Sequence, residues 1–299
     1  MAVTKQLIDR AFLERLERLT IHCMRSFAGL VGGHNASRFA GPGQEFLDHR
    51  HFHHGDDLRA VNWRAYLRLE KMFLKMFQIE PRVPVRVLLD ISESMDSGGP
   101  TAEGSKFDYT RRLAAALCYV GLVRLDTIHI QPFSNKLMDP LISGGGRHRF
   151  SPVVDFLEAL KPRGTTKFLD ISRQFIGEYP QRGLVIVISD FLDDGEVEKP
   201  LQFIADYGHE LSLIQLWAEE DRTPPWSGEL ELVDVETEKQ LEISFDDRAR
   251  QQYTEAFDQY CGTLQTLARR NGGRYVGFST SMSVEDAIFG PMVRSRGVA

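Results

Sequence analysis

The sequence lacks the features that mark disulfide-rich, fibrous or membrane-spanning chains. It has 3 cysteines in 299 residues, an odd and widely spaced set, so neither a disulfide framework nor a cysteine-based zinc site is indicated. Glycine (25) and proline (13) are near average, which excludes collagen-like and low-complexity chains. The longest apolar run, residues 113–123, is shorter than a membrane span of about 20 residues. No charged-then-apolar leader opens the chain, so we expect a cytoplasmic globular protein.

The charge is mildly acidic and unevenly distributed. Lys and Arg total 36 against 42 Asp and Glu, a net charge of −6. Residues 1–80 carry a net +3 and the remainder −9, without the concentrated basic patch that nucleic-acid binding requires. The length allows two domains. We predict an amino-terminal region of a helix plus strands at 1–83, and a second domain at 84–299 with a surface insertion at 220–246.

Only two elements are indicated before Pro84. Apolar residues recur at helical spacing over residues 5–28, which predicts an amphipathic helix. The glycine-rich stretch 29–43 is typical of a loop. Alternation around Phe73, Lys75 and Phe77 favours a strand within residues 71–80.

After Pro84, short apolar runs alternate with helical patterns. Continuously apolar strands separated by helices are typical of a buried parallel sheet with helices on both faces, so the predicted fold is α/β, doubly wound and mostly parallel. We expect strands at 85–90, 127–130, 184–188, 211–217 and 275–278, and helices at 106–124, 149–161, 167–179, 196–207 and 247–270. Residues 229–235 and 240–245 are expected to pair as a surface hairpin.

Polar side chains follow two of these strands. Asp90, Ser92 and Ser94 come directly after the first strand, and Asp190 follows the apolar run near residue 188. A Gly-Thr-Thr loop at 164–166 lies between them in sequence. Ligands of an open parallel sheet collect at the carboxyl ends of its strands, so we expect these groups to converge. Two carboxylates and three hydroxyls are hard oxygen donors that suit Mg²⁺ or Mn²⁺.

The order Asp-x-Ser-x-Ser, threonine, then a strand-end aspartate resembles the metal-ion-dependent adhesion site of von Willebrand factor A domains. The resemblance implies a Rossmann-type doubly wound fold and an ion that accepts a carboxylate from a partner protein. We favour Thr166 as the threonine because Phe168 and Ile171 then match apolar positions of the family's next helix; Thr165 is the alternative. The implied metal ligands are Asp90, Ser92, Ser94, Thr166 and Asp190.

A second resemblance lies in the amino-terminal region. It is carried by Gly41-Pro42-Gly43-Gln44-Glu45-Phe46, Arg50, Gly55-Asp56-Asp57-Leu58-Arg59 and Asn62-Trp63-Arg64. These motifs resemble the signature of the domain-of-unknown-function fifty-eight family, in which such a region precedes an A-type domain. Asn62 departs from the usual aspartate. The family is commonly associated with MoxR-type AAA+ ATPases, which implies such an ATPase as partner.

Two other clusters have competing interpretations. Four histidines, at 49, 51, 53 and 54, have the residue type of a zinc site, but nearby arginines would repel a cation and we favour a solvated or partner-facing cluster. The acidic pair Asp56-Asp57 with Arg59 has the composition of acid–base machinery. We prefer a structural Asp–Arg network with Trp63 packed beneath it.

Two functions from different classes follow. The first is a non-enzymatic, metal-dependent protein-interaction module that works with a MoxR-type ATPase in complex assembly or maturation. The alternative is a Mg²⁺-dependent hydrolase or phosphotransferase with Asp90 as nucleophile and Asp190 as a metal ligand. Such phosphotransferases generally carry a second aspartate where this chain has Ser92. A phosphate loop at 99–106 is rejected because Ser105 precedes Lys106, the reverse of the required order.

Overall fold

The chain divides into two compact units. One unit joins Met1–Ser26 with Val83–Ala299, and the other is Phe27–Arg82. This grouping differs from a single cut at residue 84, because the first helix belongs with the larger unit. The computed structural model describes residues 7–23, 45–54, 58, 61–78, 83–97, 104–124, 126–193, 195–233 and 240–298.

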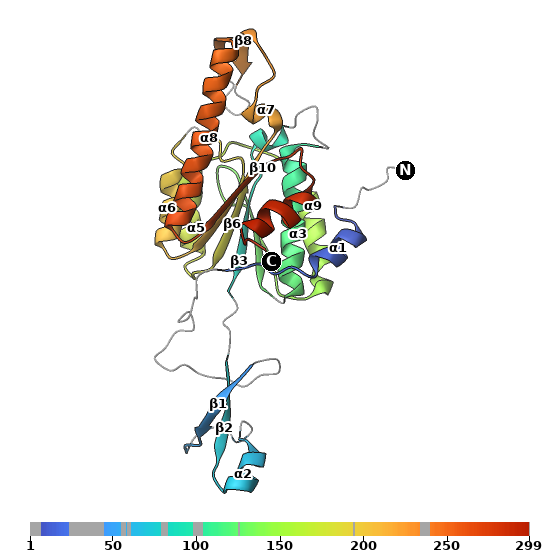
Figure 1. Ribbon diagram of the computed structural model, residues 1–299, viewed down its shortest axis with the longest axis vertical. Helices are drawn as coiled ribbons and strands as arrows, with labels where there is room; N and C mark the ends of the chain where they lie inside the picture. The colour runs from blue at the N-terminus through green and yellow to red at the C-terminus, as the bar shows by residue number, and fades with distance from the viewer. Residues whose placement is uncertain are drawn as a thin grey trace. The chain divides into compact units, whose positions relative to one another are not determined.

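A six-stranded mixed sheet forms the centre of the larger unit (Figure 1). Its strands are β3 (Val85–Asp90), β4 (Ile128–Phe133), β5 (Leu141–Ser143), β6 (Leu184–Ser189), β7 (Glu210–Trp217) and β10 (Arg274–Ser279). They lie in the order β10-β7-β6-β3-β4-β5. All neighbours are parallel except the edge strand β5, which is antiparallel to β4. The strand order reverses between β3 and β6, which makes this the topological switch point of a doubly wound sheet.

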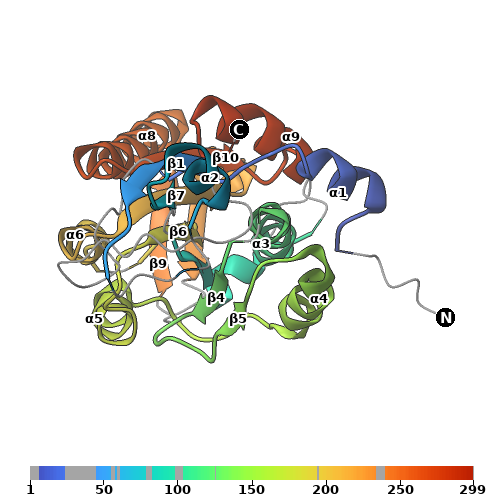
Figure 2. The ribbon, with the colours of Figure 1, turned by 90° about the horizontal axis from the view of Figure 1, so that it is seen from below.

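Helices cover both faces of the sheet, as Figure 2 shows. On one face α3 (Lys106–Val123) and α4 (Phe150–Ala159) bury apolar side chains in one core; on the other, α5 (Phe168–Glu178), α6 (Glu198–Asp206) and α8 (Asp247–Arg270) form a second. Strand residues alternate between the cores: Val87 and Leu89 face the first, Leu88 the second. This two-sided burial explains the continuously apolar strands and is the α/β architecture that the A-domain resemblance implied.

The first helix is shorter than predicted. α1 spans only Arg10–Leu16, with Asp9 as its N-cap, rather than residues 5–28. Ile21 instead forms an antiparallel bridge with Val298, and the Leu19 carbonyl accepts a hydrogen bond from Arg124 Nε at 3.1 Å. Tertiary contacts with the larger unit therefore replace the helical bonds that the periodicity predicted, and residues 24–28 lie outside the described residues.

The predicted hairpin is confirmed. β8 (Gly228–Val233) pairs antiparallel with β9 (Gln240–Phe245), and the hairpin extends with the first turns of α8 beyond the sheet (Figure 1). It follows the short helix α7 (Glu219–Arg222), which begins two residues after β7 ends. The chain closes with α9 (Val284–Ala287) and a π-helical turn, Ile288–Met292.

The smaller unit contains one strand pair and one short helix. β1 (Glu45–His51) is antiparallel to β2 (Phe73–Gln78), and α2 spans Trp63–Leu69. Asn62 caps α2 by accepting a hydrogen bond from the Ala65 amide at 3.3 Å. The prediction that Trp63 is packed beneath a polar network is wrong: its side chain is 53% exposed, because it begins a helix with no buried residue. Asp56, Asp57 and Arg59 lie outside the described residues.

No helix among the described residues is long and apolar enough to cross a membrane. The longest of them, α8, carries charged side chains along its length and has a mostly exposed surface. The apolar run at 113–123 lies within α3, where it is buried in the core of the larger unit. Its apolar character is therefore accounted for by packing within this unit.

Gly273 lies between α8 and β10, close to the backbone of β7. A Cβ at this position would lie 2.1 Å from the Leu211 carbonyl oxygen, so we expect Gly273→Ala to destabilise the protein by about 1–3 kcal/mol, as overpacking does. Gly262 in α8 has open space around it, and Gly262→Ala is expected to stabilise by roughly 0.5–1 kcal/mol. Urea unfolding of both variants measures this difference; equal stabilities would contradict it.

Candidate metal centre

The carboxyl ends of β3 and β6 bring two aspartates to the switch point. Asp90 is the last residue of β3 and is fully buried. Asp190 directly follows β6 and is 1% exposed. Since β3 and β6 are adjacent parallel strands, their ends lie at the same edge of the sheet. The crevice at such a point is where open α/β sheets bind ligands.

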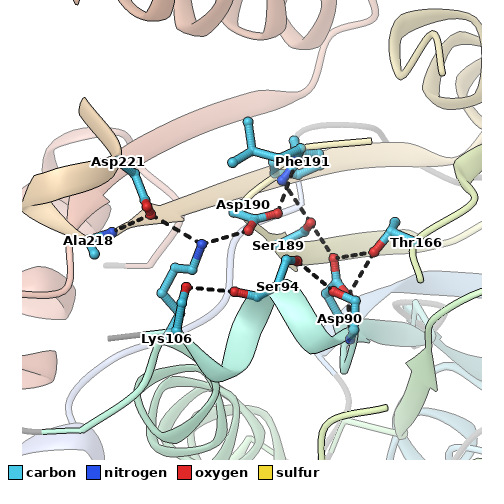
Figure 3. A network of polar contacts seen from close by, with 12 residues as sticks. Asp90, Ser94, Lys106, Thr166, Ser189, Asp190, Phe191, Ala218 and Asp221 are labelled. Carbon is cyan, nitrogen blue, oxygen red and sulfur yellow. Dashed lines mark hydrogen bonds and ion pairs between the residues drawn. The ribbon is translucent and has the colours of Figure 1, made fainter. Parts of the chain in front are cut away.

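Hydroxyl groups surround the carboxylate of Asp90 (Figure 3). Ser189 Oγ donates to Asp90 Oδ2 at 2.6 Å, and the Ser92 amide donates to Oδ1 at 3.0 Å. Thr166 Oγ1 lies 3.4 Å from Oδ1 and 3.5 Å from Oδ2. Thr166 is buried, whereas Thr165 is half-buried. Of the two threonines considered, Thr166 is the one with hydrogen bonds to Asp90.

The loop after β3 brings the serines to the same place. Ser92 is the N-cap of a 3-10 turn over Glu93–Asp96, and its Oγ lies 3.0 Å from Ser94 Oγ. The intervening Glu93 points to the exposed side, where its carboxylate accepts from the Gly164 amide at 3.4 Å and its amide donates to the Gly164 carbonyl at 2.9 Å. These bonds join the serine loop to the threonine loop.

Asp190 is held in a strained turn. Its Oδ1 accepts from the Leu192 amide at 3.1 Å. Between them Phe191 has φ 58°, a left-handed conformation that is uncommon for an aromatic residue and costs on the order of 1–3 kcal/mol. Its amide donates to Ser189 Oγ at 2.8 Å, and its ring stacks on Phe168 at 5.6 Å. Tertiary packing therefore maintains the strained backbone that orients Asp190.

A buried lysine contacts the second aspartate. Lys106 is the first residue of α3 and is 2% exposed. Its Nζ lies 2.8 Å from Asp190 Oδ2 and 3.1 Å from Asp221 Oδ2. Burial by itself lowers the pKa of Lys106, but the charges of Asp190 and Asp221 outweigh it and the pKa is raised. The side chain is therefore a charged ammonium next to a predicted metal ligand.

The negative charge of the clustered carboxylates exceeds the positive charge that lies beside them. Desolvation, followed by repulsion from Asp190, raises the pKa of Asp90 to about 7, although hydrogen bonds from Ser189 and Ser92 oppose the shift. With Asp90 deprotonated, the three carboxylates at positions 90, 190 and 221 and the one ammonium of Lys106 have a formal charge of −2. A hard divalent cation would balance that charge, and carboxylate and hydroxyl oxygens are the donors such an ion prefers. The residues present fit such an ion.

Sequence reasoning missed three residues of this cluster. Ser189 was visible as the residue before Asp190 at the same strand end. Lys106 appeared only as a residue of a rejected phosphate loop and the first residue of a helix. No sequence motif pointed to Asp221, because it lies in α7, which follows β7, whereas the predicted ligands lie at or just after the carboxyl ends of β3 and β6 or in the loop before α5.

The described side chains of the histidine cluster show no comparable geometry. His51 is exposed and its ring centroid lies 4.7 Å from that of Phe73, and His53 and His54 are exposed. The side chain of His49 lies outside the described ones. Within the described ranges, no three His, Cys, Asp or Glu side chains are grouped as they would be around a metal ion. The switch-point cluster is of a different kind, because three of its five proposed ligands are the hydroxyls of Ser92, Ser94 and Thr166.

The fold and this cluster together define the class of protein: a doubly wound α/β domain with a carboxylate–hydroxyl site at its switch point, joined to a small strand–helix unit. A family model described as "protein of unknown function DUF58" matches residues 48–260, well over half of the chain. The chain therefore belongs to this family, as its amino-terminal motifs had indicated.

Three similar proteins share 24% or less of their aligned residues with this chain. An uncharacterised protein of Mycobacterium tuberculosis, Rv1480, is 24% identical over 251 residues, which cover 83% of this chain and 78% of that protein. Among solved structures, the conserved hypothetical protein BatB of Bacteroides thetaiotaomicron is 18% identical, with 71% of this chain and 98% of that chain covered and a TM-score of 0.44. A von Willebrand factor type A protein of Catenulispora acidiphila is 11% identical, with 67% and 42% covered and a TM-score of 0.36.

The raised pKa of Asp90 predicts an unusual pH dependence in a chelating buffer. Its folded pKa of about 7 lies above the ordinary value of 3.8, so over this range the folded state binds more protons and stability falls as pH rises. Each pKa unit is worth about 1.4 kcal/mol. Asp90→Asn is expected to lose this decline, so that its stability relative to wild type improves from about pH 5 to about pH 8.

Urea unfolding at several pH values measures the effect. Burial lowers the pKa of His209 to about 4, which makes stability rise with pH toward the ordinary value of 6.5 in both proteins. The difference between the two proteins therefore isolates Asp90. Asp96→Asn, at an exposed position of the same loop, is the control. A constant offset between wild type and Asp90→Asn would contradict the prediction.

Proposed function

We propose that this protein is a non-enzymatic interaction module in which a divalent ion, Mg²⁺ or Mn²⁺, accepts a carboxylate from a partner protein. The proposed ligands are Asp90, Ser92, Ser94, Thr166 and Asp190. When bound, the ion supplies a Lewis-acidic position for an acidic side chain. The chain's own residues hold that position, exclude water from its inner side and orient the oxygens.

The observation that carries the proposal is the buried, under-neutralised pair of Asp90 and Asp190 beside hydroxyl oxygens. Burying a carboxylate without a counter-charge is costly. Here two lie at the switch point, and the one ammonium beside them contacts Asp190 and Asp221. A site of this composition favours a cation over a neutral ligand. Because only two of the five proposed ligands are carboxylates, a bound ion would keep positive charge and would attract a carboxylate from outside.

The surface beside the site suits an acidic partner. A cavity of about 390 Å³ lies next to the threonine loop, and its charged lining residues are Lys136, Arg163 and Asp139, two cations and one anion. Lys136 and Arg163 are exposed, and such charges increase the association rate of an oppositely charged segment. The cavity gives room for side chains that flank the metal-bound carboxylate, which one ion alone would hold weakly.

The environment of Asp90 favours the ligand role over the nucleophile role of the enzymatic alternative. Its carboxylate is fully buried and accepts hydrogen bonds on both oxygens, from Ser92 and Ser189. A nucleophile must be reached by its substrate, and these bonds reduce the reactivity of the oxygens. The ligand role would be contradicted if the protein hydrolysed p-nitrophenyl phosphate in the presence of Mg²⁺ and Asp90→Asn abolished this activity.

Calorimetric titration with MgCl₂ and MnCl₂ tests the site. Wild type is expected to bind one ion, Asp90→Ala to bind none, and Ser94→Ala to bind about tenfold more weakly, since one lost oxygen ligand is worth roughly 1.4 kcal/mol. Asp96→Ala, an exposed carboxylate of the same loop, is expected to bind like wild type. Circular dichroism checks that each variant is folded. Equal binding by wild type and Asp90→Ala would remove the site assignment.

The partner that we propose is a MoxR-type AAA+ ATPase, with the protein acting as an adaptor in complex assembly or maturation. Binding to the purified ATPase of the same organism should be measured with Mg²⁺ and ATP present throughout, because a chelator would also disable the ATPase. Asp90→Ala and the pair Lys136→Glu with Arg163→Glu are each expected to weaken binding about tenfold or more.

The control for charge reversal is Arg269→Glu. This residue is exposed near the end of α8, shortly before β10 begins, and so lies at the amino ends of the parallel strands rather than at their carboxyl ends. It is expected to leave the affinity unchanged. Binding that none of these substitutions alters would exclude the switch-point edge as the ATPase-binding surface.

A further inference from the structure

Lys106 is placed where a lysine is unfavourable. It is the first residue of an 18-residue helix, where the helix dipole favours negative rather than positive side chains. Its side chain is also among the largest that the larger unit buries completely, and a buried ammonium loses its hydration. A purely structural ion pair at this place offers little net stability compared with an apolar side chain of the same size.

The contacts of Lys106 divide its charge between two carboxylates. Asp190 Oδ2 lies 2.8 Å from Nζ, and Asp221 Oδ2 lies 3.1 Å away. Asp190 belongs to the proposed ligand set; Asp221 does not. Asp221 Oδ2 also accepts from the Ala218 amide at 2.8 Å, which fixes the second carboxylate independently of the first (Figure 3). The ammonium thus has one partner in the ion site and another just outside it.

We propose that Lys106 is a tethered counter-ion that sets the ion affinity of the switch-point site. It neutralises Asp190 when no divalent ion is bound, and it competes with the ion for that carboxylate. Asp221 is the acceptor that retains the ammonium when Asp190 is engaged by the ion. This inference rests on the proposed function, whose site it deepens by naming the residue that regulates it.

Charge balance supports this role. With Lys106, and with Asp90 deprotonated as a metal ligand is, the cluster of three carboxylates has a formal charge of −2, which one divalent ion neutralises. Without Lys106 the same carboxylates would have a charge of −3, and the attraction for a divalent ion would grow at short range in a low-dielectric environment. The lysine therefore lowers ion affinity and stabilises the ion-free protein, two effects that a simple salt bridge does not combine.

The first test replaces the ammonium with an apolar side chain of similar length. Lys106→Met is expected to lower the melting temperature in a chelating buffer by several degrees, because Asp190 loses its counter-charge. In saturating MgCl₂ or MnCl₂ most of that loss should disappear, and calorimetry should show ion binding about tenfold tighter or more. Lys167→Met removes an exposed lysine beside Thr166 and is expected to change neither quantity by more than about twofold.

The second test predicts a change of opposite sign. Asp221→Asn keeps an acceptor for the Ala218 amide but removes the charge that attracts Lys106 away from Asp190. The ammonium should then compete more strongly for Asp190, and ion affinity should fall by about three- to tenfold. Asp221 is 24% exposed, so this variant is expected to fold even if Lys106→Met does not.

The outcomes separate this inference from the proposed function. Opposite shifts in ion affinity for Lys106→Met and Asp221→Asn support the counter-ion role. An equal loss of stability with and without ion, and an affinity that neither variant changes, would overturn it while the metal site stands. Absence of Mg²⁺ and Mn²⁺ binding in wild type and in both variants would overturn the site and the counter-ion role together.

Discussion

Burial of negative charge at the switch point is the constraint on which the rest of this structure depends. Asp90 and Asp190 are each withdrawn from solvent at the ends of β3 and β6, where water is no longer available to solvate them. Every neighbouring polar group compensates for part of that cost: hydroxyls of Ser189 and Thr166, the amide of Ser92, and the ammonium of Lys106. Compensation is incomplete, and the remaining negative charge is the physical basis of the proposed cation site.

The fold supplies the rigidity that this arrangement requires. Apolar residues on both faces of β3 and β6 anchor the strands in two separate cores, so the carboxylates at their ends have little freedom to move apart or turn toward solvent. The left-handed Phe191 is held by its stack on Phe168 and by a hydrogen bond from Tyr260 to its carbonyl at 2.5 Å. Backbone strain of this kind persists only where packing enforces it, and it is common at functional sites.

The same edge of the sheet combines three chemically distinct parts. The carboxylate–hydroxyl site lies at its centre, the basic cavity near Lys136 and Arg163 lies beside the threonine loop, and Asp221 connects the site to α7 at the base of the hairpin β8–β9. An acidic segment of a partner that reached the ion would therefore also meet complementary charge. Under the proposed function, ion binding and partner binding would be linked through the residues that share Asp190.

Local sequence determined the five parallel strands of the sheet, the α/β class and the candidate ligands, because strand and helix periodicities and the Asp-x-Ser-x-Ser spacing are properties of neighbouring residues. It did not indicate the short edge strand β5 or β1. The helix that periodicity predicted at residues 5–28 is too long, because periodicity carries no information about the long-range pairing of Ile21 with Val298. Only the tertiary structure decided that Lys106 and Asp221 join Asp190. Their positions depend on where α3 and α7 begin relative to β6, and the spacing of residues along the chain carries no information about that distance.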